Sequence, residues 1–322
     1  MQFSPSSLAE ITKCGYKYYL TKVMGQDEPG KRGYNMLQGD IVGDAIQNAA
    51  IFLNKTKQLS DSVLGEILAS AYEHHFERNG ITLDFMRAIR NLFQYGLNES
   101  DITAIDSMAF AINCSPYEFK PPAPLKTNKI STNKKNLSMK IIKTMEDVQW
   151  FFEPQHPHYK KIRDAVSVQP EKAFEIPLGQ PYQSVINTQI VEEQDVLTGR
   201  FDLFVESHGM PEIFEFKYTA TPFNQNFVDR MVQTTSYALA IEGDCQITLF
   251  DIQAHNWYTA QITSELREQT LKRYEMARKA IQNQVYLPAC GTDPYTTNAI
   301  LCGFKCNCPF ASSDVKSEAL MV

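Results

Sequence analysis

Two carboxylates and one lysine lie on neighbouring apolar segments near the middle of the 322-residue chain. The segments are joined by Ser-His-Gly-Met, in which Gly209 permits the positive φ that a tight hairpin turn requires. A two-residue turn at His208-Gly209 pairs Asp202 directly with Glu215, with their Cβ atoms about 5 Å apart. Lys217 shares their face, because side chains two residues apart on a strand point the same way. The sequence therefore predicts that three charged groups of both signs converge on one side of a hairpin.

This cluster has the composition needed for metal-assisted hydrolysis of a phosphodiester bond. Carboxylate oxygens bind Mg²⁺ or Mn²⁺, which prefer oxygen ligands, and such an ion polarises a phosphate and acidifies a bound water. The lysine can orient that water or offset charge in the transition state, and the backbone carbonyl of Phe216 is a further candidate metal ligand. The alternative is a cross-strand salt-bridge network. A second Glu-x-Lys at Glu118-Phe119-Lys120 precedes two prolines, which predicts a loop.

Composition narrows the classes of protein only loosely. A net charge of −6 and a pI near 5.6 lack the basic excess of a protein that coats nucleic acid, although a nuclease with a local basic track remains compatible. The chain has no apolar run of about 18 residues, so we expect no membrane span. The first residues do not resemble a signal peptide. Seven cysteines without an export signal favour a reducing, cytoplasmic location.

The periodicity of apolar residues predicts a helical N-terminal region followed by an α/β core. The expected helices of residues 1–115 begin with one that is capped by Ser6 or Ser7 and runs through Leu20, and the others lie near 36–54, 60–78, 83–97 and 101–112. Residues 116–145, rich in lysine and proline, are expected to be a basic linker or loop, either simply solvated or gripping phosphates. The core, 146–288, has expected strands at 172–178, 183–191, 196–206, 212–219, 245–253 and 256–262 and helices near 224–242 and 264–284. Residues 289–322 form a cysteine-containing tail, expected to pack back near the first helix.

Three elements occur in the order of a known group of enzymes. Gly199-x-x-Asp202, Glu215-x-Lys217 and Gln233-x-x-x-Tyr237 resemble the PD-(D/E)xK nucleases of the RecB exonuclease type, which include CRISPR-associated and AddB-type members. The opening, from Phe3 to Tyr19, is similar to the N-terminal motif of the same group. The resemblance covers about residues 1–50 and 170–310. It implies an α/β fold in which helices flank a central mixed sheet, with a restriction-endonuclease-like core.

The resemblance also implies roles for individual residues. Asp202 and Glu215 would be metal ligands, and Lys217 would position the attacking water. Gln233 and Tyr237 share one helix face at a spacing of four, and in the group that face contacts the DNA backbone. Glu175 would be an additional metal ligand on the preceding strand, or else a structural strand residue.

One position departs from the group, which usually carries a metal-binding histidine four residues after a glycine in an early helix. Here Gly43 follows Gly39 and occupies the place of that histidine. The carboxylates that could take over its role are Asp40 and Asp44. The chain also has histidines at 74, 75, 156 and 158, but their positions in the sequence do not match.

The cysteines suggest a second metal centre. Related nucleases close a [4Fe–4S] cluster with one N-terminal and three C-terminal cysteines, and Cys14 with Cys302, Cys306 and Cys308 supplies that number. The spacing differs from the Cys-x₂-Cys-x₅-Cys of the group. Zinc is an alternative to iron–sulfur, and unliganded thiols are a third interpretation.

Two classes of function are compatible with these patterns. The first is a metal-dependent DNA nuclease, an exonuclease acting on ends or single strands, with a helicase or other complex subunits as partners. The second is a catalytically degenerate DNA-binding or scaffolding subunit of a repair, recombination or CRISPR complex. Retention of Asp202, Glu215 and Lys217 favours the first, because charges on an apolar hairpin are costly to bury. The missing histidine favours the second.

Overall fold

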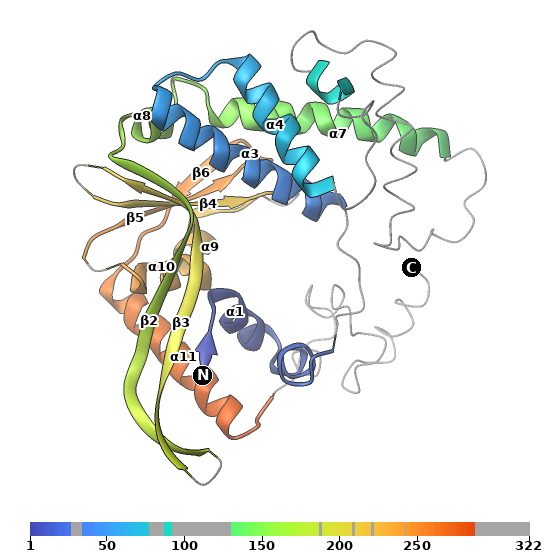
Figure 1. Ribbon diagram of the computed structural model, residues 1–322. Coiled ribbons are helices and arrows are strands. Elements are labelled where there is room, and N and C mark those ends of the chain that lie inside the picture. Colours follow the sequence, from blue (N-terminus) through green and yellow to red (C-terminus); the bar gives the residue numbers. More distant parts are fainter. Residues whose placement is uncertain are drawn as a thin grey trace.

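The computed structural model describes residues 1–26, 34–76, 87–91, 130–186, 189–207, 210–219, 222–241 and 243–286. In this part of the chain a six-stranded mixed sheet has the order β1-β3-β4-β5-β6, with β2 also paired to β3 (Figure 1). The strands are β1 (Gln2–Phe3), β2 (Ser167–Ile186), β3 (Gln189–Glu206), β4 (Glu212–Lys217), β5 (Gln246–Asp251) and β6 (Asn256–Thr259). β1 and β3 are parallel, as are β4 and β5, and the other pairs are antiparallel.

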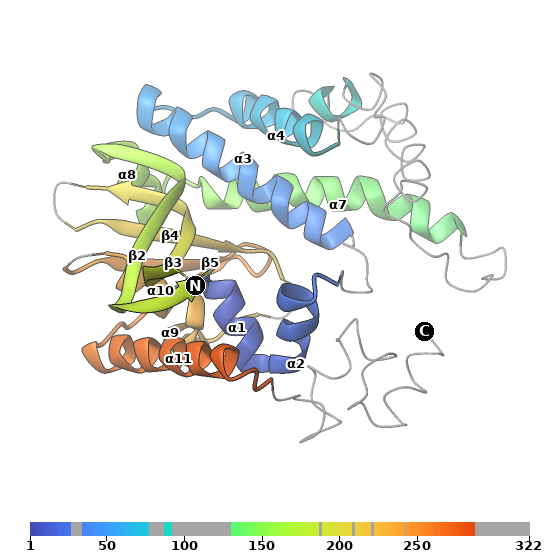
Figure 2. The same cartoon turned by 60° about the horizontal axis from the view of Figure 1, so that its bottom comes forward.

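Helices cover both faces of this sheet, so the predicted α/β class with a flanked mixed sheet is confirmed (Figures 1 and 2). On one face lie α3 (Tyr34–Thr56), α4 (Asp61–Phe76), α7 (Ile130–Phe151) and α8 (Pro157–Asp164). On the other lie α1 (Pro5–Lys13), α9 (Gln225–Arg230), α10 (Val232–Leu239) and α11 (Ser264–Gln282). Between α1 and α3 the chain forms α2 (Gly15–Tyr18) and a π-helical turn, η1 (Tyr19–Val23).

Each face of the sheet has its own apolar core. Leu203, Val205 and Phe214 pack with α3, α4, α7 and α8 in the larger one. Phe204 and Ile213 point the other way and pack with α10 in the second. This alternation is what a strand produces when consecutive side chains point to opposite faces. The helices of the N-terminal region therefore share one core with the strands.

Several element boundaries differ from those expected. Strand β1 joins the sheet beside β3, so the first residues belong to the core rather than to a separate helical region. The segment 130–145, expected as linker or loop, forms most of helix α7, because its side chains Ile141 and Thr144 are buried against the other helices. The strand expected at 172–178 lies within β2, but the single strand expected at 183–191 is wrong, because it spans the end of β2 and the start of β3, where Ile186 pairs with Gln189. The helix expected at 224–242 breaks at Met231, which is extended.

Other expectations fall partly or wholly outside the described residues. Of the helix expected at 83–97, the structure describes residues 87–91, which are helical. The helix expected at 101–112 and the tail 289–322 both lie outside the described residues. The first helix ends at Lys13, since Cys14 is extended and begins α2. Among the described helices, none has both the length and the apolar character needed to cross a membrane.

Candidate functional site

The β3–β4 hairpin has the register predicted from the sequence. Leu203 pairs with Phe214, and Phe204 with Ile213, as a turn at 208–209 requires; the turn residues themselves lie outside the described part. One step further Asp202 comes level with Glu215. At this level the link between the strands is made by a side chain, because Asp202 Oδ2 accepts a hydrogen bond of 2.8 Å from the Phe216 N–H.

The sheet is irregular at this level. The β2–β3 register passes from Pro170–Leu203 to Lys172–Phe201 and leaves Glu171 and Asp202 outside the ladder. Glu171 has a φ of 48°, which is rare for a residue other than glycine. The alternation of apolar side chains also changes phase here. Phe201 packs with the α10 side, whereas Leu203, two residues later, packs with the α3 side. Glu171 and Asp202 both line the same cleft.

Lys217 and Glu215 are held by side chains from helix α10. The Lys217 Nζ forms an ion pair with Glu215 Oε1 and donates to Gln233 Oε1 at 2.9 Å. The Tyr237 hydroxyl lies 2.9 Å from the other Glu215 oxygen and accepts a 2.7 Å hydrogen bond from Gln233 Nε2. Four side chains thus form a closed network, which fixes the orientation of both the carboxylate and the ammonium.

The electrostatics of this network are those of crowded negative charge. Burial, and next the charge of Glu215, raise the pKa of Asp202 well above its ordinary value. Burial lowers the pKa of Lys217, but the charge and hydrogen bond of Glu215 outweigh it and leave that pKa raised. Burial and the charge of Glu215 also raise the pKa of Tyr237, so its hydroxyl stays protonated. A cation placed near Asp202 would relieve the repulsion between the two carboxylates.

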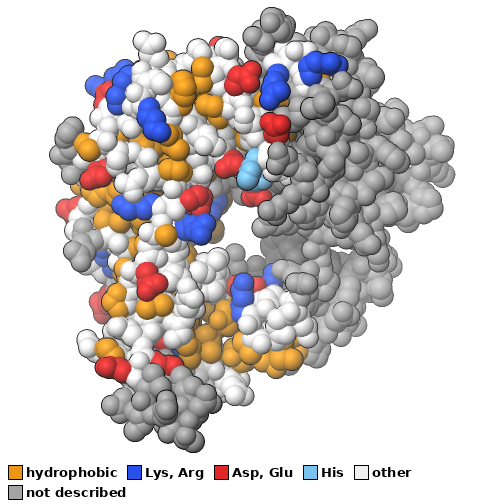
Figure 3. Space-filling model, viewed as in Figure 1, with side chains coloured by type: hydrophobic (Ala, Val, Ile, Leu, Met, Phe, Trp, Pro, Cys, Tyr) orange, Lys and Arg blue, Asp and Glu red, His pale blue; other side chains and the backbone are white. Residues whose placement is uncertain are grey.

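These groups open into a cleft of about 620 Å³ between the sheet and helix α3. The sheet supplies Asp202, Glu215, Phe216, Lys217, Tyr218, Glu171 and Arg200; helix α3 supplies Gly39, Asp40, Val42, Gly43, Asp44 and Gln47; and His75 and Gln233 complete the lining together with Thr219 and Ile252. Five carboxylates therefore face two permanent cations. Figure 3 shows acidic side chains and a histidine gathered at the hollow below the upper helices.

The donor set is compatible with a hard divalent cation held by few protein ligands. Within the described residues, no three His, Cys, Asp or Glu side chains lie close enough to form a complete ligand set. Mg²⁺ commonly takes one or two carboxylates from a protein and keeps waters and substrate phosphates as its remaining ligands. Asp202, with one oxygen on the Phe216 amide, fits such an open site. Glu215 has both oxygens engaged and would exchange one partner for the ion.

Glu175, the expected additional ligand, lies away from the cleft. It is an exposed residue that pairs with Thr198 further along the hairpin. The acidic residue of β2 that lines the cleft is Glu171, whose Oε1 accepts a 3.1 Å hydrogen bond from Gln47 of α3. That contact ties the helical wall of the cleft to the sheet.

Gln233 lines the cleft as expected, but Tyr237 does not. Its side chain is only 2% exposed, and its hydroxyl contacts Glu215 and the Arg200 carbonyl oxygen. In this conformation Tyr237 cannot contact a DNA backbone. Its position gives it the role of orienting Glu215.

Cys14, His156 and His158 do not line the cleft. The sulfur of Cys14 accepts a hydrogen bond from the Lys17 N–H and so caps the first turn of α2. Its proposed partners, Cys302, Cys306 and Cys308, lie outside the described residues. His156 and His158 belong to an aromatic cluster around Trp150, where burial lowers the pKa of His158 to about 4. These two histidines are structural.

Helix α3 brings one face to the cleft, with residues Asp40, Gly43, Asp44 and Gln47 along it. A Cβ added at Gly43 would meet no atom within 4 Å, so the place of the missing histidine is open space. The histidine that does line the cleft is His75 of α4, and its Nε2 lies 3.1 Å from Asp44 Oδ2. The sequence offered no signal for this pairing, because the two residues lie on different helices.

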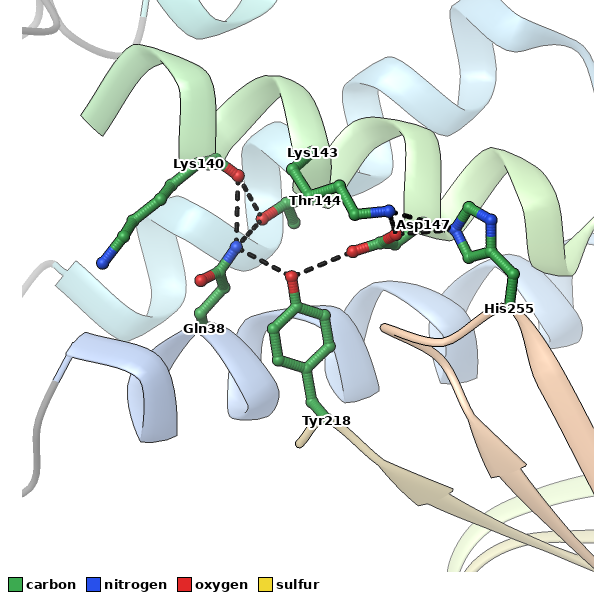
Figure 4. A network of polar contacts seen from close by, with 7 residues as sticks. All are labelled: Gln38, Lys140, Lys143, Thr144, Asp147, Tyr218 and His255. Carbon is green, nitrogen blue, oxygen red and sulfur yellow. Dashed lines mark hydrogen bonds and ion pairs between the residues drawn. The ribbon is translucent and has the colours of Figure 1, made fainter. Parts of the chain in front are cut away.

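A second polar network anchors the end of β4, as Figure 4 shows. The Tyr218 hydroxyl donates to Asp147 Oδ2 of α7 at 2.9 Å and accepts from Gln38 of α3 at 2.9 Å. Asp147 is fully buried and also contacts Lys143 and His255, at 2.6 and 2.7 Å. Burial and the Asp147 charge raise the pKa of Tyr218. The residue directly after Lys217 is thus fixed to both helices above the cleft.

Comparison with known proteins adds no relative. Neither the protein-family models nor the curated proteins contain a match to this chain.

Proposed function

We propose that this chain is a metal-dependent DNA nuclease of the PD-(D/E)xK type, with a restriction-endonuclease-like core, that hydrolyses phosphodiester bonds at DNA ends or in single strands. The observation that carries the proposal is the hairpin register, which brings Asp202 level with Glu215 and Lys217 at the mouth of one cleft. A sheet can be stable without this cluster, and crowding two carboxylates costs free energy that a purely structural role would not repay.

The side chains around the cleft supply positioning and charge. Lys217 is held between Glu215 and Gln233, so its ammonium has a fixed direction from which it can orient a water or neutralise a phosphate oxygen. Tyr237 holds the second Glu215 oxygen and so fixes the carboxylate plane. When bound, Mg²⁺ or Mn²⁺ supplies positive charge against the scissile phosphate and acidifies a water.

The charge of the cleft supports dependence on such an ion. Five carboxylates line it against the two permanent cations Lys217 and Arg200. A phosphodiester is an anion, and without an added cation it would be repelled by this surface. We therefore expect substrate binding, and not only the chemical step, to require the divalent ion.

The second candidate function is a DNA-binding or scaffolding subunit that has lost catalysis. Gly43 favours it, because the open space above this glycine lacks the imidazole expected there. Under both functions we also propose a cytoplasmic location, a helicase or other complex subunit as a partner, and an iron–sulfur or zinc centre bound by the cysteines.

The deciding experiment is cleavage of end-labelled single- and double-stranded DNA with Mg²⁺ or Mn²⁺. Asp202→Asn and Lys217→Met are compared with Lys279→Met, which removes an exposed Lys–Glu pair of α11 instead of the one in the cleft. The nuclease proposal predicts cleavage by the wild type and by the control, and a loss of at least about a hundredfold in the two cleft variants. DNA binding without cleavage in every protein supports the scaffolding function. Cleavage that survives both cleft substitutions rejects the site.

A further inference from the structure

The cleft has a second wall whose chemistry differs from that of the hairpin. His75 of α4 and Asp44 of α3 meet there through a contact of 3.1 Å between Nε2 and Oδ2. Their side chains are 22% and 32% exposed, so a substrate can reach them although they are largely packed. Within the described part of the chain, the other ring nitrogen, Nδ1, has no protein hydrogen-bond partner. One nitrogen is thus oriented by a carboxylate while the other is left for a ligand.

Resting on the proposed nuclease function, we propose that His75 is the general acid that protonates the leaving oxygen, with Asp44 as its positioning residue. Lys217 and Glu215 belong to the sheet wall and are held there by α10, whereas His75 and Asp44 belong to the helical wall. Displacement at phosphorus places the attacking and leaving oxygens roughly in line. With the water on the side of Lys217, the leaving oxygen faces the helices.

The bonds, electron pairs and protons of this step balance with water as the only co-reactant. The electron pair of the attacking water forms the new P–O bond, and the proton of that water passes to the solvent. The P–O bond to the leaving sugar breaks, its electron pair stays on the sugar oxygen, and the Nδ1 proton of the imidazolium moves to that oxygen. The neutral ring keeps its Nε2–H on Asp44, which stabilises the imidazolium when the solvent restores the proton.

The width of the cleft is set by contacts outside this pair. Gln47, one helical turn after Asp44, donates to Glu171 of the sheet at 3.1 Å. A Cβ built on Gly39, at the other end of the same helix face, would lie 3.3 Å from the Tyr218 Cβ. Helix α3 is therefore fixed against the sheet at two levels on either side of Asp44. These contacts fix the distance between the helical wall, which carries His75, and the sheet wall, which carries Lys217. A reaction with the water on one wall and the leaving oxygen at the other requires such a fixed distance.

The test compares two leaving groups. His75→Gln, Asp44→Asn and the control His74→Gln, at an exposed neighbour, are assayed with a thymidine oligonucleotide and with the p-nitrophenyl esters of thymidine 3′- and 5′-phosphate. The sugar oxygen needs a proton to leave, whereas p-nitrophenolate does not. His75→Gln should slow cleavage of the oligonucleotide by about 10²–10⁴-fold and that of the esters by less than about tenfold. Asp44→Asn should give a smaller loss, about 10–100-fold, with the same selectivity.

Other outcomes overturn the assignment. Equal losses on both kinds of substrate, or a loss that additional Mn²⁺ reverses, would make His75 a structural residue or a metal ligand. No loss at all would remove it from the site. If the wild type cleaves neither substrate, the nuclease function and the role of His75 are both rejected. If the wild type cleaves and His75→Gln cleaves equally well, only the role of His75 is rejected. Thermal unfolding of each variant shows whether it has folded.

Discussion

Replacing Asp202 by Asn should make the protein more stable while it abolishes activity. The substitution removes the carboxyl group whose pKa is raised by burial and by the charge of Glu215. The amide that replaces it keeps an oxygen that can accept a hydrogen bond from the Phe216 N–H. Sites that hold like charges together for catalysis are commonly destabilised, and relieving them yields about 0.5–2 kcal/mol. We expect a gain in this range in the free energy of unfolding at neutral pH without divalent ions.

The sign of the pH dependence follows from the direction of the shift. The Asp202 carboxyl binds its proton more tightly in the folded protein than in the unfolded chain, where its pKa is about 3.9. As pH rises from 3.9 through the raised folded pKa, the wild type therefore loses stability that Asp202→Asn retains. Below about pH 3.9 both forms are neutral at this position, and the difference between them should disappear.

The assay is urea unfolding followed by circular dichroism from pH 3.5 to 8, with Asp244→Asn as the matched control at an exposed aspartate. A repeat with Mn²⁺ should reverse the order, because an ion at about 100 times its Kd stabilises the wild type by about 2.7 kcal/mol and the variant much less. If the variant is less stable than the wild type at pH 7, or if Mn²⁺ stabilises both equally, Asp202 is neither a destabilising buried charge nor a metal ligand.

Three further predictions concern the surroundings of the cleft. Gly43→His should fold normally, because an added Cβ meets no atom there, and it should lower the Mn²⁺ concentration needed for half-maximal cleavage. Gly39→His, the comparison, should lose about 1–3 kcal/mol of stability in urea unfolding, because its Cβ meets Tyr218. Asp147→Ala should cost about 2–4 kcal/mol, since Lys143 and His255 lose their buried carboxylate partner; an unchanged urea midpoint would contradict the network. His158, with its pKa lowered to about 4, should make the wild type lose about 3 kcal/mol between pH 6.5 and 4, as the unfolded chain takes up a proton that the folded one does not. His158→Phe should flatten that part of the stability profile, and an unchanged slope would contradict the assignment.

The hairpin could be predicted because its information is local. A two-residue turn fixes which residues are opposite, and the period of two fixes the faces, so Asp202, Glu215 and Lys217 followed from one short segment. Gln233 was indicated only by the resemblance of its motif, and its predicted contact with DNA stays a prediction. The role of Tyr237 did not follow, since a spacing of four on a helix does not tell which face is buried.

The rest of the cleft depends on irregular or long-range structure. Glu171 lies just before the strand predicted at 172–178, so the sequence gives no signal for it. Even a regular hairpin with a turn at 187–188 would place Ala173 opposite Asp202, because the β2–β3 register shifts between Leu178 and Tyr182. The Asp44–His75 pair joins two helices through tertiary packing alone. The lysines of residues 130–145 predict a solvated linker or loop, but this part of α7 is helical because Ile141 packs in the core shared with α3 and α4, and that burial overrides the local signal.

The proposed nuclease depends on a divalent cation beside Asp202, and locating that ion tests the proposal most directly. Crystals of the protein grown with Mn²⁺ would be examined by anomalous diffraction at the manganese edge. We expect a peak within the cleft, about 2.0–2.3 Å from a carboxylate oxygen of Asp202, that is absent from Asp202→Asn. Manganese found only outside the cleft at saturating concentration, or a cleft peak that the variant retains unchanged, would contradict it.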